Sequence, residues 1–227
     1  MSLHLAAKNG DHTEVERYLK SGLNIDEKVS DPDQSIYGWT ALHFAAHAGQ
    51  LQIAKMLIAA GANPNAQEDK DDQTPLFFAI ERKDLEMIRT LLHTKANVNL
   101  QRLDGDSVLI QAASEGYVEV VELLLKSGAD LDLRDNLGWT AIVWAATKGF
   151  DQIVKLLIDH KISEQSIESD GDRTALLIAA SVGNTDITRL LLKSNYDPSS
   201  DSYQMALQAA AINGHYEIVS ILNRKEN

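Results

Sequence analysis

An Ala-Ala pair recurs along this chain at a fixed place in a repeated unit. The clearest pairs are Ala45-Ala46, Ala112-Ala113, Ala145-Ala146 and Ala179-Ala180, and a glycine follows each of them three residues later. The first positions of the successive units are Met1, Thr40, Thr74, Ser107, Thr140, Thr174 and Met205, which gives steps of 39, 34, 33, 33, 34 and 31 residues. Each unit carries two short helical patterns. A period near 33 residues with two helices per unit predicts a stacked solenoid in which each repeat contacts its neighbours.

The residues around these pairs resemble the ankyrin repeat. The matching stretches are Gly38–Ala46 (GWTALHFAA), Leu57–Asn63 (LIAAGAN), Val120–Asp130 (VVELLLKSGAD) and Gly138–Ile142 (GWTAI). The resemblance covers about the whole chain in seven units, although only Pro75 keeps the family's Thr-Pro dipeptide and only His4 and His43 keep its histidine. It implies an all-α fold: an ankyrin-repeat solenoid of about seven helix-turn-helix units with extended β-turn fingers.

The length of each step predicts how the chain is organised. We expect a single ankyrin-repeat domain over 1–227, with an N-terminal cap repeat at 1–26, five internal repeats at 37–199 and a C-terminal cap repeat at 200–227. Polar residues at the positions that face a neighbour in internal repeats, such as Glu14 and Arg17 at one end and Asn223 at the other, favour caps. The first step is about six residues too long. We interpret residues 27–36 as an inserted loop, either neutral or part of a binding face.

Glycines mark the helix ends in pairs twelve residues apart, such as Gly10/Gly22 and Gly116/Gly128. A helix that ends in the left-handed conformation favours glycine, which lacks a Cβ. Lys83, Lys95, Lys161 and Asn195 replace glycine at four of these positions. We expect strain or a different helix end there.

Composition excludes several classes of function. The net charge is −12, which repels nucleic acid, and the chain has no cysteine for disulfides or thiolate metal sites. No stretch approaches the roughly 20 apolar residues of a membrane span. Because the first repeat starts at Met1, we expect no cleavable leader. The resulting expectation is a cytoplasmic protein, with leaderless secretion left open.

Chemical motifs are scarce. His43 and His47 have the i,i+4 spacing of a metal pair, but Phe44 stands where a zinc hydrolase needs glutamate and no third ligand is evident. In the ankyrin family the histidine that matches His43 binds turn backbone. No phosphate loop, dinucleotide motif or nucleophile elbow occurs. We therefore predict no catalytic residue, no metal site and no cofactor.

The resemblance places the variable, exposed positions of each unit on the fingers and on the residues just before the inter-helix glycine, along one concave face. All three tryptophans fall on fingers or first helices, and tryptophan and tyrosine are common interface anchors. The predicted partner-binding residues are Tyr37, Trp39, Phe44, His47, Asp71, Phe78, Glu81, Arg82, Asp104, Gln111, Glu115, Trp139, Trp144, Lys148 and Arg173. Packing within the repeats is the alternative role for each aromatic residue.

Acidic residues cluster on every predicted finger. The clusters are Asp31/Asp33, Glu68/Asp69/Asp71/Asp72, Asp104/Asp106, Asp132/Asp135 and Glu168/Asp170/Asp172. Together they predict a negative ridge that attracts a basic protein surface. The alternative is that acidity only keeps the solenoid soluble.

The function expected from these features is a non-catalytic protein–protein interaction module: an adaptor, a scaffold or a stoichiometric inhibitor that is a monomer by itself. Because the repeats fill the whole chain, action by occupancy is favoured over recruitment of an attached domain. Two alternatives stay open. One is a microbial effector or immunity-type protein, and the other is a small-ligand-binding or enzyme-associated role that uses the aromatic groove.

Overall fold

The chain divides into two compact units, Met1–Val108 and Leu109–Asn227. The computed structural model describes residues 2–30, 36–94, 96–163, 170–193 and 197–224, without the side chains of 161–163 and 170–174. Apart from one isolated bridge between Gln101 and Ser107, the regular structure of the described residues is helical. The predicted all-α repeat fold is confirmed.

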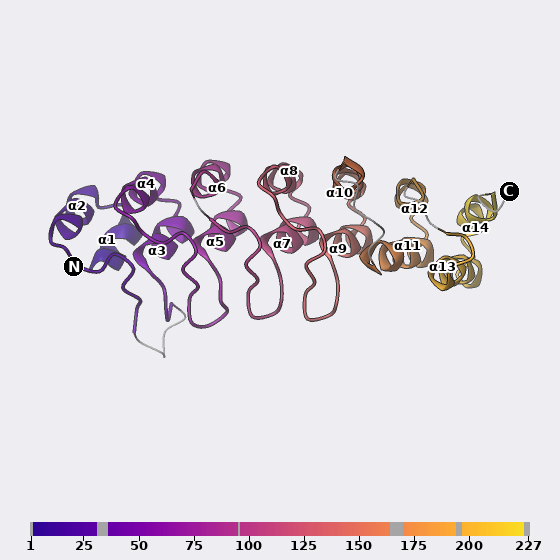
Figure 1. The fold of residues 1–227 in the computed structure, drawn as a ribbon, viewed down its shortest axis with the longest axis horizontal. Coiled ribbons are helices and arrows are strands. Elements are labelled where there is room, and N and C mark those ends of the chain that lie inside the picture. The colour runs from indigo at the N-terminus through magenta and orange to yellow at the C-terminus, as the bar shows by residue number, and fades with distance from the viewer. Residues whose placement is uncertain (1, 31–35, 95, 164–169, 194–196, 225–227) are drawn as a thin grey trace. The chain divides into compact units, whose positions relative to one another are not determined.

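Unit 1 consists of three helix pairs. Its helices are α1 (Leu3–Asn9), α2 (His12–Lys20), α3 (Ala41–Ala48), α4 (Leu51–Ala59), α5 (Pro75–Glu81) and α6 (Leu85–Leu92). The first, or inner, helices of the pairs form one row in which α1 contacts α3 and α3 contacts α5, and the outer helices form a second row (Figure 1). Loops that we call fingers project from the side of the inner helices that faces away from the outer row.

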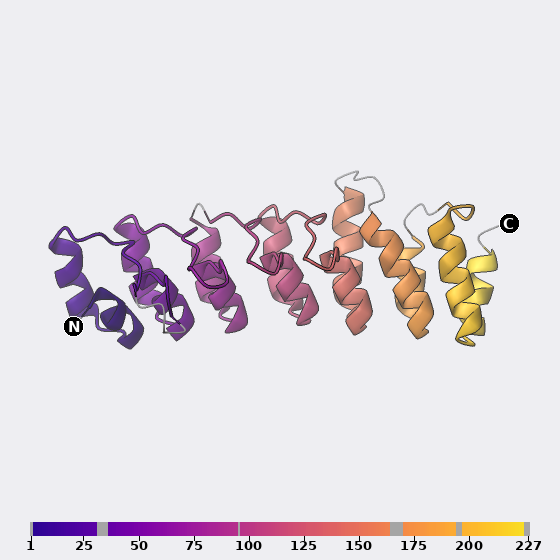
Figure 2. The same cartoon turned by 90° about the horizontal axis from the view of Figure 1, so that it is seen from below.

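Unit 2 repeats this arrangement. Its helices are α7 (Val108–Ser114), which starts at the unit boundary, α8 (Val118–Lys126), α9 (Ala141–Lys148), α10 (Asp151–Ser163), α11 (Asp170–Val182), α12 (Thr185–Leu191), α13 (Asp201–Ile212) and α14 (Tyr216–Arg224). The inner helices α9, α11 and α13 contact one another in order, as do the outer helices α8, α10, α12 and α14. Figure 2 shows these helices side by side.

The Ala-Ala pairs form the contact surface of the inner helices. Their side chains are almost fully buried in α1, α3, α7, α9 and α11. Outer helices contribute larger buried side chains, such as Ile53, Met87 and Leu124. Helices this short are unstable alone in water, so burial against the neighbouring pair stabilises them.

Helix ends follow the glycine pattern where glycine is present. Gly49 and Gly149 end α3 and α9 in the left-handed conformation, with φ of 71° and 77°. Lys83 adopts the same conformation with φ 56°, which confirms the strain predicted there. Lys161 behaves differently, because α10 continues through it to Ser163. Lysine favours helix continuation where no glycine stops the helix.

Fingers precede α3, α5, α7 and α9. The prediction of a fifth finger, with Asp170 and Arg173 at its tip, is wrong. Asp170 and Arg173, expected at its tip, lie in the first turns of helix α11. Glu168 and Lys95 fall outside the described residues, as do Asp31, Asp33 and Asn195. The longer α10 and α11 use residues that the other repeats use for a finger.

The terminal helix pairs expose both polar and apolar side chains. On α2, Arg17 forms an ion pair with Glu14 at 2.8 Å. The last pair leaves Met205, Ile212 and Tyr216 exposed. Leu5 in the first pair is also exposed, as is Asn223 in the last pair, on which the C-terminal cap was predicted. The 1–26 and 200–227 cap boundaries stay predictions.

His43 links two repeats from a fully buried position. The Thr40 backbone N–H donates to His43 Nδ1 at 3.0 Å, so the proton of the neutral ring lies on Nε2. Nε2 then donates to the Gln73 carbonyl, also at 3.0 Å. Burial lowers the pKa of His43 to about 4, although its backbone hydrogen bonds oppose the shift. The predicted structural role of this histidine is confirmed.

Gly38 and Gly138 offer a matched test of finger packing. Both have positive φ, 76° and 79°, but a Cβ on Gly38 would lie 2.3 Å from the Asp69 backbone nitrogen, whereas one on Gly138 meets nothing within 4 Å. We expect Gly138→Ala to lower the free energy of unfolding by about 1 kcal/mol from backbone strain alone. Gly38→Ala should cost at least about twice as much. Urea unfolding measures both, and equal losses would contradict close packing of the first two fingers.

The His43 pKa predicts a pH dependence of stability. In the unfolded chain this histidine has a pKa near 6.5, whereas in the folded chain its pKa is about 4. Between these two pH values the unfolded state therefore binds more protons than the folded state. Stability should therefore fall as the pH is lowered from 6.5 to 4, by up to about 3 kcal/mol from this group. Urea unfolding at several pH values should show a smaller decrease for His43→Gln than for wild type. His12→Gln, on the exposed face of α2, is the control and should behave as wild type.

Candidate functional site

Unit 1 contains an aromatic cluster that spans its three inner helices. The Trp39 ring centroid lies 5.1 Å from that of Phe44 and 4.5 Å from that of Phe78. His4 on α1 contacts the edge of Phe44 with centroids 5.7 Å apart. Offset and edge-to-face contacts of this kind stabilise packed aromatic groups. The cluster holds Trp39 of the first finger against α3 and α5 and joins α1 to α3.

The burial of the aromatic residues in this cluster shows whether they can contact a partner or instead form part of the core. Trp39, Phe44 and Phe78 are only 7%, 4% and 5% exposed. They belong to the hydrophobic core of unit 1 and present little surface to a partner. His47 covers the cluster from an exposed position, with its ring 5.1 Å from Trp39 and 5.8 Å from Phe78. Tyr37, two residues before Trp39 on the first finger, is half-buried.

Unit 2 presents its two tryptophans differently. Trp139 on the fourth finger and Trp144 on α9 are half-buried, and their rings meet edge to face with centroids 4.9 Å apart. Leu137, next to them on the finger, is 68% exposed. The Lys148 ammonium lies 5.9 Å from the centroid of the Trp144 ring. We name Leu137, Trp139, Trp144 and Lys148 the tryptophan patch.

The buried carboxylate of Asp135 holds the tryptophan patch in place. Its Oδ1 accepts the backbone N–H groups of Leu137 and Trp139, each at 2.8 Å. Its Oδ2 accepts the indole N–H of Trp144 at 2.7 Å. One side chain thus fixes the finger and orients an aromatic side chain on the adjoining helix. The sequence pattern assigns Asp135 only to the acidic ridge. Its position three residues before Gly138-Trp139 is the signal that indicates a turn-capping role.

Other predicted acidic tips also have local partners. Buried Glu68 accepts the backbone N–H groups of Lys70, Asp71 and Gln73 at 2.8, 2.7 and 3.2 Å. Asp104 and Asp106 bind Arg102 at 2.9 and 2.6 Å. Asp69 pairs with Lys28. Hydrogen bonds to backbone N–H groups leave the charge of Glu68 in place, whereas the ion pairs of Asp69, Asp104 and Asp106 offset theirs locally. The negative ridge stays a prediction.

The remaining predicted contacts are divided between the two units. Glu81 and Arg82 are exposed at the end of α5, and Glu81 accepts from Gln73 Nε2 at 3.2 Å. Asp104 is exposed and Asp71 is half-buried. In unit 2, Glu115 is exposed, whereas Gln111 is buried, and no described residue forms a hydrogen bond with its Oε1. The Arg173 side chain is outside the described set.

No grouping of three or more histidine and acidic side chains suited to a metal ion lies within the described residues. Likewise, none of the described helices is long and apolar enough to cross a membrane. The candidate site that these residues form is a surface, the tryptophan patch.

Comparisons with known proteins agree with this architecture. The family model described as "Ankyrin repeats (3 copies)" matches residues 3–102, 83–168, 109–202 and 163–227. A solved ankyrin repeat domain from Acinetobacter baumannii AYE is similar, with 33% identity, a TM-score of 0.71 and coverage of 84% of this chain and 96% of that one.

Curated relatives match over part of their length. The B-cell lymphoma 3 protein homolog of Mus musculus is 32% identical over 117 residues, which is 51% of this chain and 25% of that protein. The nuclear factor NF-kappa-B p105 subunit of Gallus gallus is 35% identical over 119 residues, 51% of this chain and 12% of that protein. The match thus spans a quarter or less of these relatives. The paired helices, the fingers and the family match across nearly all residues show that the chain belongs to the ankyrin-repeat family.

Proposed function

We propose that this chain is a non-catalytic interaction module that binds a partner protein through the tryptophan patch. Ankyrin repeats are protein–protein interaction modules. The observation that carries the proposal is the patch itself. Exposed Leu137 and half-buried Trp139 lie on a finger fixed by Asp135, and the Trp139 ring meets the half-buried Trp144 of α9. Large aromatic side chains held rigidly at a surface lose little conformational entropy on binding, which favours them as anchors.

Electrostatics supports a partner with a basic surface. The net charge of −12 attracts positive proteins over the range of the Debye length, even though many finger carboxylates have local partners. Binding by occupancy suits an adaptor, a scaffold or a stoichiometric inhibitor, and a monomeric chain is enough for it. Cytoplasmic localisation stays a prediction, supported by the lack of cysteine.

The patch predicts which substitutions weaken binding. Partners captured by tagged wild-type chain are first compared, by quantitative mass spectrometry, with those captured by Trp139→Ala. For a purified partner that the variant loses, calorimetry should show Trp139→Ala weakening affinity about thirtyfold, as expected when an anchor worth about 2 kcal/mol is truncated. Leu137→Ala should weaken it less. Affinity for a basic partner should also decline as salt increases.

Leu103→Ala is the matched control. Leu103 is 65% exposed on the preceding finger, close to the 68% of Leu137, so truncation removes the same apolar side chain from another site. It should leave the affinity unchanged. Thermal unfolding must first show that each variant is folded. A folded Trp139→Ala variant that binds every partner at wild-type affinity would exclude the tryptophan patch as the binding surface.

A further inference from the structure

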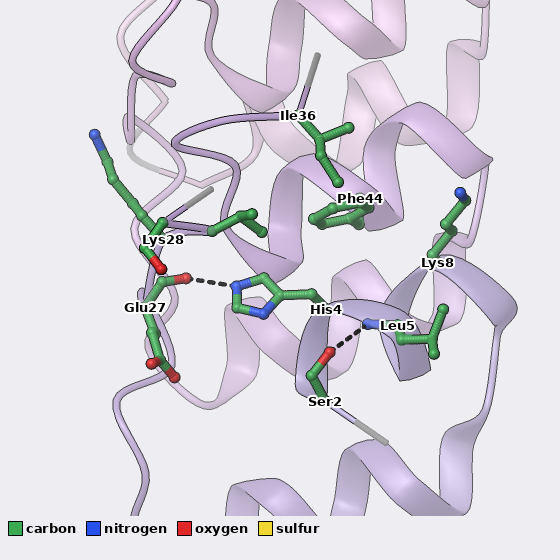
Figure 3. Close-up of a pocket in the computed structure, with 10 residues that line it drawn as sticks. Ser2, His4, Leu5, Lys8, Glu27, Lys28, Ile36 and Phe44 are labelled. Carbon is green, nitrogen blue, oxygen red and sulfur yellow. Dashed lines mark hydrogen bonds between the residues drawn. The ribbon is translucent and has the colours of Figure 1, made fainter. Parts of the chain in front are cut away.

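A pocket of about 430 Å³ lies in unit 1, far in sequence from the tryptophan patch. Its apolar lining comes from Leu5 on α1, Phe44 on α3, and Val29 and Ile36 on the first finger. In Figure 3, Ile36 and Leu5 lie on opposite sides of the Phe44 ring. The pocket is open to solvent, and its volume lies within the range of roughly 300–1,000 Å³ that ligand sites occupy.

The finger that lines this pocket is the one whose length breaks the repeat. Its segment 27–36 contains the additional residues of the first step, and Val29 and Ile36 belong to it. Val29 is fixed to the base of the finger, because its N–H donates to the Trp39 carbonyl at 2.9 Å. His4 Nε2 donates to the Glu27 carbonyl at 2.7 Å and joins the finger to α1. The described residues of this finger, Glu27–Ser30 and Ile36, thus line one side of the pocket.

Lys8 is the cation that is available at this pocket. Lys28 also lines it, but Lys28 pairs with Asp69 and its chain points away from Phe44 in Figure 3. The Glu27 carboxylate points away as well. The Lys8 ammonium lies on the Phe44 side and forms no ion pair with any described residue. A ligand in the pocket therefore meets an apolar surface with one positive charge beside it.

We propose that this pocket binds one bulky apolar side chain of a partner polypeptide, with a single carboxylate next to that side chain positioned at Lys8. Leu5 is 44% exposed, and such an anchor would cover it together with Ile36 and Phe44. One carboxylate fits better than several, because the chain as a whole is acidic and repels a strongly acidic segment. The inference rests on the proposed function only in taking the occupant from a protein.

The open mouth favours a polypeptide over a free small molecule. An enclosed site buries most of a small ligand, whereas an open pocket leaves room for the backbone on either side of an anchoring side chain. A peptide that supplies both groups in adjacent residues also holds them in the right relative position, which reduces the entropy cost of binding. Short peptides are therefore suitable probes of the site.

The test uses an acetylated, amidated pentapeptide, Gly-Glu-Phe-Gly-Gly, titrated into the ¹⁵N-labelled full chain. Two companion peptides replace its phenylalanine with glycine or its glutamate with lysine. We expect saturable shifts of the amides of Leu5, Lys8 and Val29 with the first peptide. The glycine companion should give no saturable shift, and the lysine companion should bind about fivefold more weakly. Lys8→Glu should weaken binding of the first peptide about fivefold, as expected for an exposed ion pair.

Lys55→Glu provides the matched control, because Lys55 is an exposed helical lysine of unit 1 that does not line the pocket. The Lys55→Glu variant should bind the peptide with the same affinity as the wild-type chain. Leu5→Asp, at an exposed apolar position, should abolish binding in a folded chain. Saturation by 3-phenylpropionate as tightly as by the peptide would overturn the polypeptide assignment. Absence of pocket shifts, or equal binding by Lys8→Glu and wild type, would overturn the site and leave the tryptophan-patch proposal intact.

Discussion

Everything in this fold depends on the close approach of neighbouring inner helices, which the paired alanines permit. Alanine adds only a methyl group to the helix surface, so its pairs are almost fully buried between helices of seven to thirteen residues. No helix pair of this size retains its structure alone. Stability must therefore be shared between neighbours within each unit, and a local defect weakens the adjoining repeats.

The same repeat position supports opposite roles in the two units. Phe44 and Trp144 occupy equivalent places on their inner helices, yet Phe44 is buried in a cluster with Trp39 and Phe78, whereas Trp144 stays half-buried. The difference arises from hydrogen bonding and crowding. Asp135 binds the Trp144 indole N–H and fixes the finger, whereas the first finger packs on the backbone of the second at Gly38. Local packing thus decides whether the aromatic residue at this repeat position is buried in the core, as Phe44 is, or partly exposed at the surface, as Trp144 is.

Buried polar groups determine the geometry of the fingers. Glu68 and Asp135 accept two or three backbone N–H groups each, and His43 joins Thr40 to Gln73. These side chains accept or donate hydrogen bonds with backbone N–H and C=O groups of the fingers. Because a finger is neither helix nor sheet, those backbone groups have no partner in a regular hydrogen-bond pattern. An acidic residue in a finger sequence is therefore as much a turn-forming residue as a source of external potential. The number of acidic residues in a finger is therefore not by itself a measure of the external potential.

The sequence by itself determined the fold class, the repeat register and most helix ends, because these follow from local periodicity and from the preference of glycine for positive φ. It also predicted the strain at Lys83. It did not distinguish a buried tryptophan from a half-buried one, nor show that α10 runs past Lys161 and that Asp170 and Arg173 are helical. Only tertiary structure decided these points and built the pocket at Lys8. The exposure of each tryptophan, the partners of each finger carboxylate and the shape of the pocket all depend on residues that are distant in sequence. A repeat pattern does not tell which of these distant residues come into contact.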